Sequence, residues 1–289
     1  MLPSPPMFHR IVALLACVLL TACAPARGGG PAGATSLQPI VMQGAMDAEV
    51  AKLAASLVGG TQTQVAGWTF WTGTIAGYPV VVSKTRRGTT NASAATAIAI
   101  ERFHPAAIIN QGTAGGHQPD LHVYDIVVGK ESVNLGAFRT PFRARGSGSN
   151  VADWGPIDLL KSDTTSVGLD PAARVIRRFS GDTRLLTAAL DLSDRYRKGR
   201  VVEGVIGSSD TWNSELDRIQ RLHDEFGTSV EEMETAAAAQ IAGSFQVPFL
   251  GLRVLSNNIT NGERYDPRTA EACQDFVLEV VKEYRRRRP

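Results

Sequence analysis

Hydrophobic and polar positions follow two alternating periods along most of this chain. Apolar runs of strand length occur at residues 37–44 and 106–111. Stretches in which apolar residues recur every three or four positions occur at residues 47–58 and 91–103. The short runs predict buried strands and the periodic stretches predict helices. Because strands and helices alternate, the sequence predicts an α/β fold.

The same pattern extends to the C-terminus. Further strands are expected at residues 68–75, 78–85, 201–209 and 248–257, and further helices at residues 183–196, 214–226 and 266–284. Ala76 and Gly77 predict a hairpin turn, and Asn91 is the expected N-cap of its helix. Residues 138–165 lack periodicity and are expected to form a long loop. The expected architecture is a single-domain three-layer sandwich, in which helices cover both faces of a mixed, mostly parallel central β-sheet.

The first 37 residues are expected to lie outside this domain. Arg10 precedes an apolar run at residues 11–20, which is too short to span a bilayer and is typical of an export signal. The run ends in Leu20-Thr21-Ala22-Cys23, which resembles a bacterial lipoprotein signal peptide (residues 1–23) with lipid on Cys23. A plain secretory signal is the alternative.

Residues 24–37 are rich in Gly, Ala and Pro and predict a flexible linker before a domain at residues 38–289. We therefore expect an exported protein, either a membrane-anchored lipoprotein or a periplasmic or otherwise extracytoplasmic protein. The membrane contact would be made through the lipid anchor.

Composition and cysteine count exclude several classes of function. The chain has 289 residues and a formal net charge of +2, without a basic stripe interleaved with aromatics, so no nucleic-acid partner is expected. Its cysteines are Cys17 in the signal, Cys23 and the single Cys273, which provide no framework for disulfides or for a metal. Neither a metal nor a cofactor is expected.

Polar residues gather where the predicted strands end. Four such segments are residues 44–49, 112–116, 208–213 and 256–258. Ligands of open α/β sheets bind beyond the carboxyl ends of strands, so these segments are expected to enclose one pocket. A fifth segment, VEEMETAA, places Glu231, Glu232 and Glu234 just before a helix rich in alanine. Acidic residues there either complement the helix dipole or face a ligand.

The stretches GAMDAEV, IINQGTAGG, VEEMETAA and VPFLGLRVLSN, in this order, resemble the nucleoside phosphorylase superfamily. They are most similar to the methylthioadenosine/S-adenosylhomocysteine nucleosidases, over residues 39–84, 89–128 and 201 to the closing helix. The resemblance implies a nucleoside phosphorylase-like fold and cleavage of a purine N-glycosidic bond through an oxocarbenium-like state. It also implies a small-molecule purine nucleoside as substrate and a homo-oligomer, expected to be a dimer.

The resemblance also implies roles around the sugar. Glu234 matches the glutamate that bridges the ribose 2′ and 3′ hydroxyls, a task that suits a carboxylate because it accepts two hydrogen bonds side by side. Met233 would lie against the sugar. Glu49 matches the catalytic glutamate that polarises a water toward the anomeric carbon, and Thr113 matches a hydroxyl near that water.

At the base, Trp212 matches an aromatic residue that stacks on the purine, and Ser256 is expected among the substrate-binding residues. Asn257 departs from the family pattern, because hydrolytic members carry an aspartic acid there to protonate the leaving adenine. An amide donates a hydrogen bond but not a full proton.

The nature of the nucleophile follows from a neighbouring position. Bacterial purine nucleoside phosphorylases have an arginine where this chain has Asn110, so water is the expected nucleophile and a nucleosidase the expected enzyme. Two alternatives stay open because of Asn257. One is a phosphorolytic purine nucleoside phosphorylase acting on 6-oxopurines, and the other is a non-catalytic exported nucleoside-binding or storage-type protein.

Overall fold

A computed structural model describes residues 37–159 and 178–287. The predicted signal peptide, Cys23 and the linker up to residue 36 lie outside the described residues. In the described part of the chain, no helix is both long enough and apolar enough to cross a membrane.

The described strands are β1 (Ile40–Gly44), β2 (Val58–Val65), β3 (Trp68–Ile75), β4 (Tyr78–Lys84), β5 (Ala107–Gly116), β6 (Ile126–Asn134), β7 (Phe138–Arg139), β8 (Gly155–Pro156), β9 (Arg178–Ser180), β10 (Val201–Ser208), β11 (Thr228–Glu232) and β12 (Phe249–Asn257). The α-helices are α1 (Asp47–Ala55), α2 (Thr89–Phe103), α3 (Thr183–Leu190), α4 (Leu216–Phe226), α5 (Thr235–Ser244) and α6 (Thr269–Arg286), and the short 3-10 helices are η1 (Val151–Asp153) and η3 (Ser193–Arg195).

One large sheet runs in the order β11-β10-β6-β12-β5-β1-β4-β3-β2, with β9 paired to β6. The strands from β5 through β1 to β4 are parallel, and so are β12 with β5 and β10 with β6. Antiparallel pairs join β2, β3 and β4, and also β12 with β6. The sheet is therefore mixed, as predicted, although antiparallel pairing is more extensive than a mostly parallel sheet implies.

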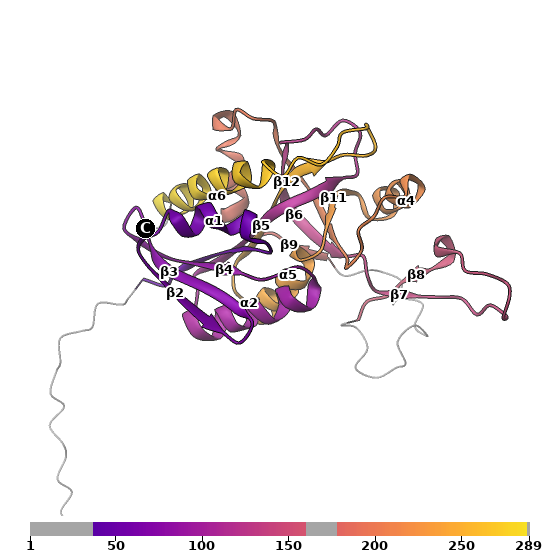
Figure 1. Cartoon of the computed structure of the whole chain (residues 1–289), viewed down its shortest axis with the longest axis horizontal. Coiled ribbons are helices and arrows are strands. Elements are labelled where there is room, and N and C mark those ends of the chain that lie inside the picture. The colour runs from indigo at the N-terminus through magenta and orange to yellow at the C-terminus, as the bar shows by residue number, and fades with distance from the viewer. Residues whose placement is uncertain (1–36, 160–177, 288–289) are drawn as a thin grey trace, which may run out of the picture. The chain divides into compact units, whose positions relative to one another are not determined.

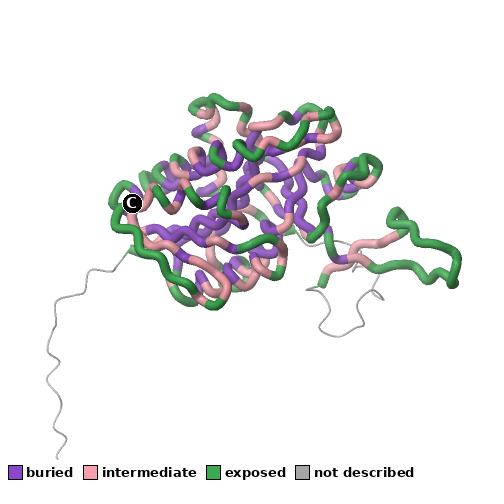
Figure 2. The backbone as a smooth tube through the Cα atoms, in the orientation of Figure 1, coloured by how far each residue is buried: buried purple, intermediate pink, exposed green. Residues whose placement is uncertain are grey.

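Each face of the sheet packs against its own helices. On β1, Ile40 and Met42 contribute to a core with α1, α3 and α6, whereas Val41 contributes to a core with α2 and α5. Ile109 and Ile108 on β5 are divided between the two cores in the same way. The strand period of two thus supplies both faces and confirms the three layers predicted from sequence (Figure 1). Buried residues accordingly follow the strands and the inner sides of these helices (Figure 2).

An additional pairing brings the glutamate-bearing strand next to the glycine loop. β11 runs parallel to β10, and it also pairs antiparallel with the end of β5, where Glu231 lies opposite Gly115. Strands β5, β12, β6, β10 and β11 therefore form a closed ring of pairings. At the end of β12 the register shifts between Leu255 and Asn257, and such a bulge re-aims the side chains around it. The ends of β5, β11 and β12 consequently meet in one place.

Two local predictions were wrong. Helix α2 begins at Thr89 instead of after an Asn91 cap, because the Thr89 amide donates to Asp210 at 2.8 Å. Residues 138–159 are not a featureless loop, since β7 and β8 pair with each other around η1. Residues 160–165 of that predicted loop lie outside the described residues.

Candidate active site

A cavity of about 260 Å³ lies where these strand ends meet. All seven residues that the sequence singled out for catalysis or substrate binding line it, namely Glu49, Thr113, Trp212, Met233, Glu234, Ser256 and Asn257. They come from α1, β5, β11 with the start of α5, β12 and the segment between β10 and α4. The fold therefore gathers residues more than two hundred positions apart in the sequence around one space.

Glu49 is buried and held by four donors. Its Oε2 accepts hydrogen bonds from the amides of Ala45 at 2.9 Å and Met46 at 3.1 Å. Its Oε1 accepts from the amide of Thr113 at 2.8 Å and from the Thr113 hydroxyl at 2.9 Å. The carboxylate is thus clamped between the start of α1 and the glycine loop after β5, which fixes its orientation toward the cavity.

The glycine loop has no room for a larger residue beside Glu49. A Cβ added at Gly112 would lie 2.8 Å from Glu49 Oε1 and 3.0 Å from Glu49 Cδ. Close approach of the strand backbone to the carboxylate therefore requires glycine at this position.

Glu234 is also buried, but it has fewer partners. Its Oε1 accepts a hydrogen bond from the Gly88 amide at 2.8 Å, and its Oε2 lies 3.9 Å from Arg253 Nη2. Among the described residues Oε2 accepts no hydrogen bond. Burial, and after it the charge of Glu232, raises the pKa of Glu234 to about 8. One oxygen of this carboxyl group is therefore open to a ligand.

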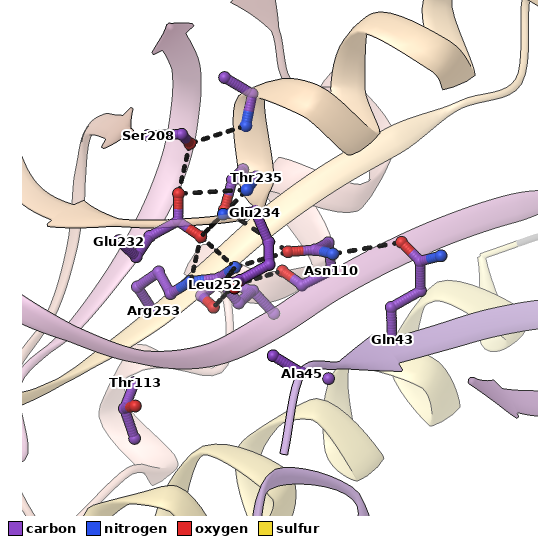
Figure 3. Close-up of polar contacts among 12 residues, drawn as sticks. Gln43, Ala45, Asn110, Thr113, Ser208, Glu232, Glu234, Thr235, Leu252 and Arg253 are labelled. Atoms are coloured by element: carbon purple, nitrogen blue, oxygen red, sulfur yellow. Dashed lines mark hydrogen bonds and ion pairs between the residues drawn. The ribbon is translucent and has the colours of Figure 1, made fainter. Parts of the chain in front are cut away.

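Glu232 supports this arrangement from behind. Its carboxylate accepts from Nε of the buried Arg253 at 3.1 Å, from the amides of Glu234 and Thr235, and from the Ser208 hydroxyl (Figure 3). The amides belong to the start of α5, so Glu232 serves the helix start, which is one of the two roles considered for these acidic residues. It also pairs with an arginine that is 1% exposed and whose charge would otherwise be unmatched.

The segment at the end of β12 presents an amide to the cavity. Ser256 Oγ lies 3.2 Å from the carbonyl oxygen of Ala114 and 3.2 Å from Asn257 Oδ1, so its single proton is shared between these two acceptors. Among the described residues, no acceptor is within hydrogen-bond distance of Asn257 Nδ2. Trp212 lies at the other side of the site and is 72% exposed. Trp212 is therefore not a buried core tryptophan.

Several polar residues that line the cavity had no predicted role, among them His117, Asn213 and Arg87. His117 is buried, with Nδ1 2.8 Å from Thr228 Oγ1 and Nε2 3.2 Å from Glu231 Oε2. Asn213 Nδ2 donates to Glu231 at 3.0 Å. Burial raises the pKa of Glu231, but the hydrogen bonds from His117, Ser209 and Asn213 together hold it below its usual range. Asn213 lies in the segment 208–213 that was expected to border the pocket, although no role was predicted for it, and the available signal for His117 was its position directly after the glycine loop.

Another lining residue without a predicted role is Arg87, immediately before Gly88. In the described ranges no three His, Cys, Asp or Glu side chains converge in a way that could hold a metal ion. The side chains that line the site offer carboxylates, amides and hydroxyls, with an aromatic and a cationic side chain beside them.

Comparison with known proteins agrees with this arrangement. The family model of the phosphorylase superfamily matches residues 39–287. A 5′-methylthioadenosine/S-adenosylhomocysteine nucleosidase of Anoxybacillus flavithermus is 34% identical over 219 residues, which cover 75% of this chain and 84% of the relative.

Solved structures of the same kind of enzyme have the same fold. The nucleosidase of Colwellia psychrerythraea in complex with adenine is 28% identical with a TM-score of 0.67, covering 86% of this chain and 96% of that one. The Neisseria meningitidis enzyme in complex with methylthio-immucillin-A is 25% identical, also with a TM-score of 0.67, covering 85% and 99%. The chain therefore belongs to the phosphorylase superfamily, and within it to the family of the 5′-methylthioadenosine/S-adenosylhomocysteine nucleosidases.

Proposed function

We propose that this protein is an N-glycosyl hydrolase that cleaves purine nucleosides of the methylthioadenosine and S-adenosylhomocysteine type with water. The observation that carries the proposal is the arrangement of Glu49 and Glu234 around one cavity. One carboxylate is fully held by the protein, and the other has a free oxygen. The names of the relatives support the same reaction and the same class of substrate.

Glu49 is the proposed base for the nucleophile. The nucleophilic water adds its oxygen to the anomeric carbon as the bond from that carbon to the purine nitrogen breaks, and the water's proton passes to Glu49. Four hydrogen bonds hold the carboxylate, so it does not have to reorganise during this step. Thr113 donates both its amide and its hydroxyl to the same oxygen and thereby orients the base.

Glu234 is the proposed ribose-binding residue. Its free Oε2, together with Oε1, suits the two adjacent hydroxyls of a ribose, because a carboxylate accepts hydrogen bonds from both. Met233 and Ser256 complete the walls of the cavity around the substrate. The sugar would be held while positive charge develops at its anomeric carbon.

Asn257 and Trp212 are the proposed contacts of the leaving purine. Trp212 offers a largely exposed ring on which a base can stack. Asn257 Nδ2 can donate a hydrogen bond to a purine nitrogen, but the proton that neutralises the leaving group then has to come from solvent. This site consequently lacks part of the leaving-group activation that a carboxylic acid provides.

A second candidate is phosphorolysis of 6-oxopurine nucleosides, which the Asn257 amide favours because it can donate to a purine oxygen. Asn110 argues for water, however. It is 1% exposed, its Oδ1 accepts from Arg253 Nη2, and its Nδ2 donates to Gln43. It therefore places no cation beside the nucleophile.

Product analysis of the purified protein tests the proposal. Methylthioadenosine, S-adenosylhomocysteine, adenosine and inosine are incubated with and without phosphate, and bases and sugars are separated. Release of adenine and free sugar without phosphate is the expected result. A strict requirement for phosphate with a sugar 1-phosphate as product would establish the phosphorylase, and binding without turnover would establish the non-catalytic protein.

We further propose that the protein is exported, with Cys23 lipidated, and that it forms a homodimer. The pattern of residues 1–23 supports export. Phe142, between β7 and β8, is 94% exposed, and Leu159, after β8, is 57% exposed. These apolar side chains support a contact with a second copy in this part of the chain. Sedimentation of the wild type and of Phe142→Ser measures this, and a monomeric wild type would contradict the dimer.

A further inference from the structure

Arg87 contributes a positive charge to the cavity wall that the protein itself does not neutralise. Among the described residues, no carboxylate or carbonyl pairs with its guanidinium, and it is the only lysine or arginine that lines the cavity. The other charged or chargeable donors nearby are occupied. Arg253 is bound by Glu232, and both ring nitrogens of His117 have partners. Arg87 is thus free to bind a ligand.

The backbone around Arg87 is fixed to both halves of the site. The Gly88 amide donates to Glu234 at 2.8 Å. The Thr89 amide and hydroxyl donate to Asp210, which lies two residues before Trp212, at 2.8 and 2.7 Å. The backbone of Arg87 is therefore held in a defined position next to Glu234, the carboxylate proposed to bind the sugar.

Arg86 offers a direct contrast. It adopts a left-handed backbone conformation with φ of 66°, and its guanidinium packs beside Gly67, where an added Cβ would meet Nη1 at 3.2 Å. It does not line the cavity. The two adjacent arginines thus lie in different places: Arg86 packs beside Gly67, and Arg87 lines the cavity.

The charge of the ligand narrows what Arg87 can recognise. Purine bases and ribose hydroxyls are neutral at pH 7, so neither gives a guanidinium a charged partner. An anionic oxygen group has to come from a substituent on the sugar or from a free anion. Because Arg87 adjoins the sugar-binding side through Gly88, the substituent on the sugar's 5′ carbon is the better source.

On this basis, which rests on the proposed function, we propose that Arg87 is a specificity-determining residue that binds a carboxylate or phosphate on the 5′ side of the nucleoside. S-adenosylhomocysteine carries such a carboxylate, whereas methylthioadenosine ends in a neutral methylthio group. The protein then prefers the substrate that carries the carboxylate, and the preference weakens as salt screens the exposed guanidinium of Arg87.

Kinetics of the wild type, Arg87→Met and the matched control Arg86→Met test this inference. Arg87→Met is expected to lower kcat/KM for S-adenosylhomocysteine about tenfold, mainly through KM, because a charge-assisted hydrogen bond is lost. Turnover of methylthioadenosine is expected to change less than about twofold, and Arg86→Met to leave the ratio of the two substrates unchanged. A second comparison, of kcat/KM for adenosine 5′-monophosphate with that for adenosine, measures the preference for a phosphate. A larger effect of Arg87→Met in this pair than in the S-adenosylhomocysteine pair would identify phosphate as the preferred group.

Other outcomes overturn the inference. An unchanged substrate ratio in Arg87→Met would show that the side chain is only solvated surface. Stimulation of methylthioadenosine cleavage by inorganic phosphate that Arg87→Met abolishes would assign Arg87 to a free anion. If no nucleoside is cleaved, the proposed function fails by itself, and calorimetry still decides the inference. Selective loss of S-adenosylhomocysteine affinity in Arg87→Met would support it, and equal affinities of wild type and variant would reject it.

Discussion

The two glutamates that face the cavity are held in different ways, and the difference suits different tasks. Glu49 accepts four hydrogen bonds from the protein, whereas Glu234 accepts one, from Gly88, and keeps an oxygen free. A group that orders the nucleophile gains from a fixed position, and a group that binds hydroxyls needs unoccupied acceptor sites.

The raised pKa of Glu234 predicts pH-dependent binding. With a pKa of about 8 in the empty site, the group carries a proton at pH 7, and ribose hydroxyls bind best to the ionised form. Nucleoside affinity should therefore rise as the pH increases toward 8, and binding at pH 7 should release a proton. Calorimetry in buffers of different ionisation enthalpy measures the release. Glu234→Gln should abolish it and weaken binding by about 2 to 4 kcal/mol.

The same shift has a consequence for folding. The Glu234 carboxyl group has a higher pKa in the folded protein than in the unfolded chain, so its contribution to stability is fully present at acidic pH and is lost as the pH rises through about 8.

For the binding prediction, a nucleoside affinity that is independent of pH between 6 and 9, with no proton released, would contradict the role of Glu234 as a charged acceptor.

Replacing Asn257 by Asp tests how the leaving base is stabilised. If the protein is a nucleosidase that has lost its proton donor, Asn257→Asp should raise adenine release about a hundredfold, because protonation of a leaving group commonly contributes that much. Turnover of inosine should fall, since a charged acceptor would then face a carbonyl oxygen. The ratio of adenine to hypoxanthine release measures both effects.

Asn257→Leu is the control, because leucine has a similar size and can neither donate nor accept. It should reduce cleavage of both nucleosides if the amide donor contributes at all. If Asn257→Asp instead lowers adenine release, and lowers the rate of hypoxanthine release even more, the result would favour the second candidate, the 6-oxopurine enzyme.

At the scale of elements, the start of α1 and the end of β5 act as one unit through Glu49. Gly112→Ala would place a Cβ 2.8 Å from Glu49 Oε1, so either the carboxylate or the β5 backbone has to shift. We expect kcat to fall at least about tenfold and stability to fall by about 1 to 3 kcal/mol. Rate assays and urea unfolding check the two effects.

Gly243 in α5 is the matched control, since an added Cβ there meets nothing within 4 Å. Gly243→Ala should leave activity unchanged and stabilise the helix by up to about 1 kcal/mol. Full activity of Gly112→Ala would show that the position of Glu49 is not critical for the reaction.

Local sequence signals were sufficient for elements whose causes are local. Ile40, Val41 and Met42 form an apolar run in the sequence, which predicted a buried strand. In the structure this strand supplies side chains to both cores, as the predicted α/β architecture requires. The start of α2 was not visible, because Asp210, which accepts from Thr89, lies 121 residues away in the chain. A cap supplied from another element leaves no local pattern.

Strand β2 and the cluster around His117 were missed for related reasons. Residues of β2 are mostly exposed and polar, and the strand exists because β3 pairs with it. His117 meets Glu231 because the ends of β5 and β11 pair antiparallel across a long stretch of sequence. Six of the seven predicted site residues, all except Trp212, belong to the four motifs that resemble the family, whereas Arg87 and His117 lie between or beside those motifs.

At the scale of the whole molecule, the proposed chemistry and the proposed location constrain each other. An extracytoplasmic nucleosidase acts on nucleosides outside the cytoplasm. A site that recognises an anionic 5′ substituent would select among the nucleosides found there. Residues 24–37, the proposed linker, are rich in Gly, Ala and Pro, which would suit a tether between the proposed anchor and the catalytic domain.

Lipidation at Cys23 is the prediction on which this location depends. The apolar run at residues 11–20 and the following Leu20-Thr21-Ala22-Cys23 predict cleavage before Cys23 and a lipid on its sulfur. Mass spectrometry of the mature N-terminus should show modified Cys23, and the protein should partition with membranes because acyl chains bury many methylene groups. Cys23→Ala should remove the lipid and the membrane association, whereas Cys273→Ala, which alters a buried thiol in the core, should keep both. An unmodified N-terminus before residue 11 in a cytosolic fraction would show that the segment is not an export signal.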